Sequence, residues 1–109
     1  MNEITTKELK ELVEKRKAGH IDIFGYVLID VREQYEFEDG SIPGAVNVPM
    51  DEVIDSGVVE NAIQTCDKVI FSCRSGKRSK AVNYMLKKLH KTHNTYNLIG
   101  GYLEWKENE

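Results

Sequence analysis

Residues 69–80 read Val-Ile-Phe-Ser-Cys-Arg-Ser-Gly-Lys-Arg-Ser-Lys, and this stretch decides the fold class. Its apolar start, Val69–Phe71, is typical of a strand that is buried on both faces. From Ser79 to Leu89, apolar residues recur at helical spacing, and these are Ala81, Val82, Met85, Leu86 and Leu89. A buried strand that leads through a short loop into an amphipathic helix is typical of a parallel α/β sheet. The loop at the carboxyl end of such a strand is where ligands bind.

The rest of the chain repeats this alternation of short strands and helices. Further strands are expected at Ile4 and at residues 26–31, 45–48 and 95–99. Helical segments are expected from Thr5 or Thr6 to about Gly19, at 32–38, at 50–65 in two pieces broken near Ser56-Gly57, and at 102–106. Thr5 and Glu8 have the spacing of a capping box, which marks a helix start. The pattern therefore predicts an α/β domain with a mainly parallel sheet.

Composition excludes several classes of protein. The chain has 109 residues and a net charge of -3, so we expect one domain over residues 1–109 and no nucleic-acid partner. Two cysteines are too few for a disulfide scaffold, and no apolar run reaches the roughly 20 residues of a membrane span. The polar start, Met1–Glu8, is unlike a secretory signal. We expect a cytoplasmic protein, with a monomer as the default.

The charge is distributed unevenly along the chain. Residues 73–80 hold four basic side chains and no acid, which leaves 11 basic and 18 acidic residues, a net of -7, elsewhere. Basic surroundings and a helix N-terminus both lower the pKa of a thiol from about 8.5. Cys73 is therefore expected to be a thiolate nucleophile at neutral pH. Gly76 allows the loop to curl so that its N–H groups converge on an anion.

A structural interpretation of the same residues remains available. Most intracellular cysteines are small apolar residues of the core, and most basic residues at a helix start are solvated. However, a core position would not adjoin four cations. Cations also oppose the dipole at a helix N-terminus, so an anionic group is expected to compensate them.

Four segments in a fixed order give the chain its resemblance to a known family. They are Leu28–Arg32 with Glu33 and Glu36, Gly40–Ala45 with Asn47 and Pro49, Cys73–Ser79, and Leu98–Gly101 with Trp105. With these segments, the chain resembles a single-domain rhodanese, a sulfurtransferase, over nearly its full length. The resemblance implies a three-layer α/β fold, with a mainly parallel five-stranded sheet and helices on both faces.

The resemblance also implies a mechanism without a cofactor or a metal ion. Cys73 would take a sulfane sulfur from thiosulfate or a persulfide donor and pass it, as a persulfide, to cyanide or a thiol. Donor binding would involve Arg74, Lys77 and the backbone amides of residues 74–78, which include those of Ser75 and Gly76. Arg78 matches the arginine that closes the loop, whereas Asp30 and Arg32 match a motif for which we expect structural hydrogen bonds and ion pairs.

One position departs from the family pattern, and two other functions remain open. Ser41 stands where these chains commonly have His, so contacts that need an imidazole are in doubt. The domain could be a persulfide carrier for a partner protein. It could also be a thiolate phosphatase or arsenate reductase, but such enzymes usually carry Cys-x5-Arg, and here Ser79 lies six positions after Cys73.

The remaining candidate residues favour structural roles. The spacing of Cys66, Cys73, His90 and His93 lacks the close cysteine pair of zinc motifs. A strand separates Cys66 from Cys73, which places the two thiols beyond disulfide range. For the aromatic residues Tyr35, Phe37, Tyr102 and Trp105, core packing is the favoured interpretation, and lining of the pocket is the alternative.

Overall fold

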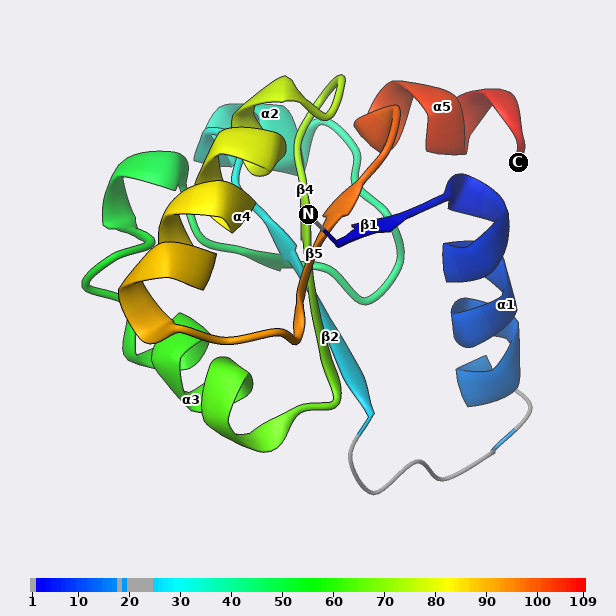
Figure 1. The fold of residues 1–109 in the computed structure, drawn as a ribbon. Coiled ribbons are helices and arrows are strands. Elements are labelled where there is room, and N and C mark those ends of the chain that lie inside the picture. Colours follow the sequence, from blue (N-terminus) through cyan, green and yellow to red (C-terminus); the bar gives the residue numbers. More distant parts are fainter. Residues whose placement is uncertain (1, 18, 20–24) are drawn as a thin grey trace.

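One parallel sheet organises the molecule in the computed structural model, which describes residues 2–17, 19 and 25–109. The strands follow the order β1-β5-β4-β2-β3, and every pairing is parallel. Their bounds are β1 Glu3–Ile4, β2 Tyr26–Asp30, β3 Val46–Asn47, β4 Lys68–Ser72 and β5 Thr95–Leu98. Helices cover both faces of the sheet (Figure 1). The predicted three-layer α/β fold is confirmed.

The helices begin close to the positions that the sequence predicts. Their bounds are α1 Thr6–Lys17, α2 Gln34–Glu38, the 3-10 turn η1 Met50–Glu52, α3 Gly57–Thr65, α4 Lys77–His90 and α5 Gly101–Glu107. The capping box at α1 is confirmed, because the Thr5 amide donates to Glu8 Oε1 and the Glu8 amide donates to Thr5 Oγ1. Ser56 Oγ likewise accepts from the Val59 amide at the start of α3.

Helix α4 is longer than predicted at both ends. It ends at His90, one residue after Leu89. It begins at Lys77, two residues before Ser79, because Gly76 takes the N-cap position with a φ of 96°. This left-handed conformation is readily available to glycine. The predicted apolar stripe is also narrower than expected: Val82 and Leu86 are fully buried, whereas Ala81 and Leu89 are exposed.

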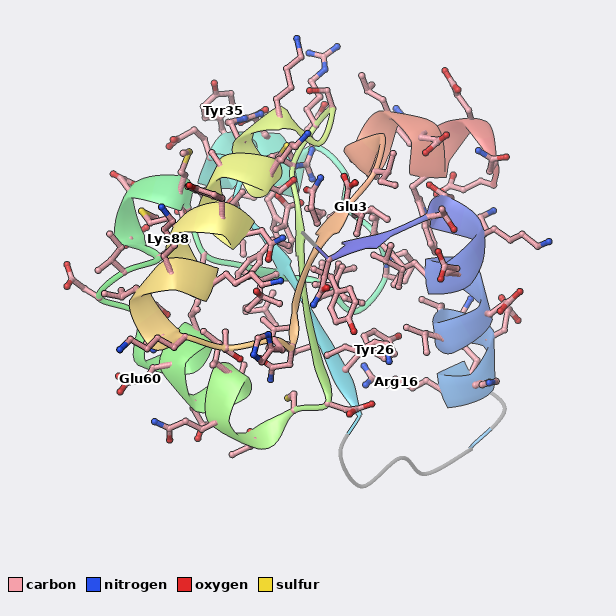
Figure 2. All side chains as sticks on the ribbon, viewed as in Figure 1. Glu3, Arg16, Tyr26, Tyr35, Glu60 and Lys88 are labelled. Atoms are coloured by element: carbon pink, nitrogen blue, oxygen red, sulfur yellow. The ribbon has the colours of Figure 1, made fainter. Side chains whose placement is uncertain are left out.

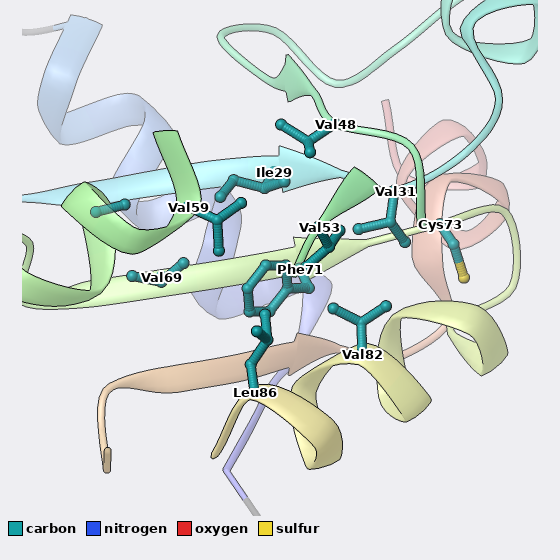
Figure 3. Packing of buried hydrophobic residues seen from close by; sticks show 11 residues of the cluster. Ile29, Val31, Val48, Val53, Val59, Val69, Phe71, Cys73, Val82 and Leu86 are labelled. Atoms are coloured by element: carbon teal, nitrogen blue, oxygen red, sulfur yellow. The ribbon is translucent and has the colours of Figure 1, made fainter. Parts of the chain in front are cut away.

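Side chains alternate between the two faces of the sheet and form two cores. Leu28, Ile70 and Leu98 pack against α1 and α5 in one core. In the other core, Ile29, Phe71 and Val82 pack between the sheet, α3 and α4, and Cys73 closes the cluster at one end (Figure 3). No helix among the described residues is both long and apolar enough to cross a bilayer.

A buried ion pair fixes the edge of the sheet where β2 ends. Arg32 Nη2 lies 2.7 Å from Asp30 Oδ2, and both side chains are at most 5% exposed. The Arg32 guanidinium also donates to the Gly40 carbonyl and stacks on the Tyr102 ring. The pair therefore joins the end of β2 to the turn after α2 and to α5.

We predict that Asp30→Asn destabilises the fold by about 3–5 kcal/mol, because Arg32 is left buried without a counter-ion. Urea unfolding measures the change in the free energy of unfolding. Glu11→Gln is the matched control, since Glu11 is exposed on α1 and its loss should change stability by less than about 0.5 kcal/mol. Equal effects of the two substitutions would contradict this role of Asp30.

Candidate active site

The parallel register places the predicted nucleophile beside the Asp30–Arg32 pair. Asp30 at the end of β2 is opposite Ser72 at the end of β4, and the Val31 amide donates to the Ser72 carbonyl. Cys73 directly follows Ser72, and three residues separate it from α4. In Figure 3 its sulfur is directed toward the first turn of that helix. The loop therefore lies at the carboxyl edge of the sheet.

Three donors surround the sulfur of Cys73. The Gly76 amide lies 3.1 Å from Sγ, and the amide and hydroxyl of Ser79 each lie 3.4 Å from it. The first amides of a helix have no carbonyl partner within the helix, and they carry the positive end of its dipole. The arrangement therefore favours a negative charge on the sulfur.

The donors differ in part from those expected from the sequence. Gly76 belongs to the predicted range 74–78, but Ser79 lies outside it and was missed. The Ser79 hydroxyl also lies 2.6 Å from Asn97 Oδ1 on β5. A hydroxyl has one proton, so it donates to only one of these two acceptors at a time. Only the tertiary fold brings Asn97 to this position, since it is distant in sequence from the loop.

Helix α5 holds the loop in place through two backbone hydrogen bonds. The amides of Tyr102 and Leu103, at the start of α5, donate to the carbonyls of Cys73 and Arg74. Gly101 makes this approach possible: with a φ of +58°, an added Cβ would lie 2.5 Å from the Cys73 carbonyl oxygen. Such a contact is far inside van der Waals range, so a side chain at position 101 would displace the loop.

An ion pair ties the loop to α2. Arg78 donates to both carboxylate oxygens of Glu36, at 2.8 and 3.0 Å. This hydrogen bonding from Arg78 lowers the pKa of Glu36 to about 2, and the same contact raises the pKa of Arg78. The Arg78 side chain is therefore engaged with α2, as a residue that holds the loop in place would be.

The tip of the loop is open to solvent although the sulfur is not. Cys73 is 1% exposed, whereas Arg74, Ser75 and Lys77 are exposed. Burial of Cys73 alone would fit a core cysteine. The amide donors on its sulfur and the adjacent cations distinguish Cys73 from a core cysteine.

Aromatic residues line a depression beside the loop. It has a volume of about 400 Å³, and its lining includes Tyr35, Arg74, Tyr102 and Lys106. The prediction of core packing is wrong for Tyr35, which is 73% exposed and points outward from α2, a short helix with no buried residue (Figure 2). Trp105 is buried in the α1–α5 core, as expected.

Two other features lie outside this site. A larger groove, of about 860 Å³, runs between α1 and α5 and has none of the loop residues in its lining. Cys66 is the C-cap residue that follows α3, and both cysteines are free thiols. Within residues 2–17, 19 and 25–109, no three His, Cys, Asp or Glu side chains come together as metal ligands.

The fold and the site define a class: an α/β domain that holds a cysteine sulfur among amide donors at the N-terminus of a helix. The model of the rhodanese-like domain matches residues 5–108, and this chain belongs to the rhodanese family. It is 35% identical to the putative sulfurtransferase YtwF of Bacillus subtilis, with 97% of this chain and 91% of the relative covered.

Two further comparisons place the chain within the family. The human single-domain sulfurtransferase TSTD1 superposes with a TM-score of 0.75 at 25% identity, with 100% of this chain and 98% of that chain covered. The adenylyltransferase and sulfurtransferase MOCS3 of Drosophila persimilis is 32% identical over 73% of this chain. The chain spans only 19% of that relative's length.

We predict that Ser79→Ala slows alkylation of Cys73 by iodoacetamide about fivefold at pH 7, because a hydrogen bond to a charged acceptor is lost. Ser75→Ala is the control, since Ser75 is exposed at the loop tip and should react like the wild type. An unchanged rate in a folded Ser79→Ala protein would show that the hydroxyl does not stabilise the sulfur.

The pair of Glu36 and Arg78 should make stability depend on pH in the acid range. The pKa of Glu36 falls from 4.5 to about 2 in the fold, so the pair stabilises the fold fully above about pH 5. This stabilisation is lost as the pH falls from about 4.5 toward 2. Relative to Glu36→Gln, the wild type should be about 1 kcal/mol more stable at pH 6 and lose that advantage near pH 2–3, measured by urea unfolding. A difference that stays constant over this range would contradict the assignment.

Proposed function

We propose that the chain is a sulfurtransferase that carries a sulfane sulfur on Cys73. The observation that supports this most directly is the pair of backbone amides, of Gly76 and Ser79, that donate to Cys73 Sγ at the N-terminus of α4. These donors stabilise a thiolate, which is the reactive form of a cysteine. They also suit the anionic persulfide that forms when the thiolate accepts a sulfur atom.

Two displacement steps complete the reaction. The Cys73 thiolate attacks the outer sulfur of thiosulfate, forms an S–S bond and releases sulfite with the electron pair of the broken bond. The outer sulfur of the Cys73 persulfide is then attacked by cyanide or by a thiolate. This step yields thiocyanate or a new persulfide and regenerates the Cys73 thiolate. Neither step requires an external oxidant or reductant.

The exposed cations at the loop tip fit an anionic donor. Arg74 and Lys77 have solvent-exposed side chains beside the buried sulfur. We assign them to the sulfonate of thiosulfate or to the anionic groups of a persulfide donor. Ser75 is exposed between them, and its amide would contribute to the same anion site.

The site fits sulfur transfer better than phosphate-ester hydrolysis. Cys73 is 1% exposed, which favours a donor that presents one terminal sulfur atom over a tetrahedral phosphate. A phosphatase also needs an arginine directed at the bound oxyanion, whereas Arg78 here is paired with Glu36. The names of YtwF and TSTD1 as sulfurtransferases add support for this class of activity.

We predict that thiosulfate adds one sulfur atom, roughly 32 Da, to the wild type, because the thiolate displaces sulfite. Intact-protein mass spectrometry before and after cyanide treatment measures the gain and its loss. Cys73→Ser should abolish both the adduct and thiocyanate production. Cys66→Ser is the matched control and should retain them, since Cys66 lies outside the loop.

Two outcomes would contradict the proposal. One is the absence of an adduct with thiosulfate, polysulfide and glutathione persulfide alike. The other is Cys73-dependent turnover of p-nitrophenyl phosphate, which would identify a phosphatase. Steady-state rates with cyanide, glutathione and a reduced protein thiol then separate an enzyme that uses small acceptors from a carrier that serves a partner.

A further inference from the structure

The basic character of the active loop continues far beyond it. From Lys68 to Leu103 the chain has eight Lys and Arg residues and no Asp or Glu, so all 18 acids lie elsewhere. Helix α4 occupies the middle of this segment. The loop is therefore one end of a longer basic surface.

That surface is a single face of α4. At 100° per residue, positions 77, 80, 84, 87 and 88 fall within about 100° of arc, opposite the buried Val82 and Leu86, and Lys91 follows at the C-cap of the helix. We name these residues the α4 stripe: Lys77, Lys80, Tyr84, Lys87, Lys88 and Lys91. All except the half-buried Lys87 are exposed. The stripe extends about 21 Å from the loop, at 1.5 Å per residue.

No acidic side chain among the described residues pairs with the stripe. None of its lysines forms an ion pair with a described residue, and Lys88 instead lies over the Tyr84 ring, 4.7 Å from its centre. By contrast, α1 mixes both signs, with Glu8 in its first turn and Lys15 in its last. Lys77 and Lys80 are like charges three apart in the first turn, where they repel each other, and cations at a helix N-terminus oppose its dipole. A ligand with negative charge would relieve both effects.

We propose that the α4 stripe docks an acidic protein segment that flanks the reactive cysteine of a sulfur donor or acceptor protein. This inference rests on the proposed function and specifies its partner. Figure 2 shows Lys88 far along α4 from the loop. A segment bound along this face would reach the loop tip at its end, where its cysteine could exchange sulfur with Cys73.

The shape of the basic surface favours a protein over a nucleic acid. A basic helix face also occurs in nucleic-acid binders, but such domains are strongly basic overall. Here the net charge is -3, and the acidic remainder of the chain would repel a phosphate backbone that extends beyond the stripe. An exposed aromatic side chain, that of Tyr84 at 52%, accompanies the lysines. Tyrosine is enriched at protein interfaces, where it anchors contacts.

The test uses two synthetic peptides of equal length, each with one cysteine thiol, flanked by Glu in one and by Lys in the other. The chain is loaded with thiosulfate, and transfer of sulfur to each peptide is timed by mass spectrometry. The variant Lys87→Gln/Lys88→Gln/Lys91→Gln removes the far end of the stripe. The matched control, Lys7→Gln/Lys15→Gln/Lys17→Gln, removes the same charge from exposed positions of α1.

The wild type should transfer sulfur to the acidic peptide about tenfold faster than to the basic one, through electrostatic steering. The stripe variant should lose most of this preference, while the α1 control keeps it. Thiosulfate-to-cyanide turnover should be equal in all three proteins. Lys87 lies roughly 15 Å along the helix from Lys77, beyond the ~8 Å screening length that limits its effect on a small donor.

Three results would overturn the docking proposal. They are equal rates with the two peptides, an equal loss of preference in the α1 control, or stripe-dependent binding of a labelled oligouridylate that exceeds binding of the acidic peptide. Failure of the proposed function has a different signature, since no sulfur then loads onto Cys73. In that event, the fluorescence anisotropy of a labelled acidic peptide mixed with Cys73→Ser still measures docking. Absence of binding would then overturn the docking proposal.

Discussion

The contact between Cys73 Sγ and the first amides of α4 is the interaction on which the site depends. A sulfur buried to 1% exposure can carry a negative charge only if donors replace the water that it has lost. The amides of Gly76 and Ser79 supply this replacement without a side chain that must be ordered. Gly76 can do so because its left-handed backbone starts the helix directly at the sulfur.

Three neighbouring elements then hold the loop that this interaction requires. Helix α5 donates two backbone amides to the loop carbonyls, and Gly101 allows the close approach. Helix α2 holds Arg78 through Glu36. The buried pair of Asp30 and Arg32 stabilises the adjacent strand end. The loop is thus fixed by backbone contacts and ion pairs, which leaves the side chains at its tip exposed to solvent.

The basic and acidic residues are separated along the chain, and the basic ones also lie together in the folded molecule. The acids lie outside residues 68–103, and the cations of that segment gather at the loop and along α4. Near the sulfur, this field favours an anionic donor. The charge of the lysines farther along α4 is screened before it reaches the site, so it acts only on a partner large enough to contact them. A persulfide carrier and an enzyme with small acceptors share the same loop, and under the docking proposal the distal lysines serve only the carrier.

The sequence by itself determined the fold class, the strand and helix order, and Cys73 as the candidate nucleophile, because apolar periodicity and local charge are properties of neighbouring residues. It did not determine that Asn97 contacts Ser79, that Arg78 pairs with Glu36, or that α5 donates to the loop. These contacts join residues far apart in the chain, and the parallel register decides which of them meet. The outward direction of Tyr35 was also decided by tertiary structure. Aromatic character alone favoured burial, whereas the fold leaves α2 with no buried residue.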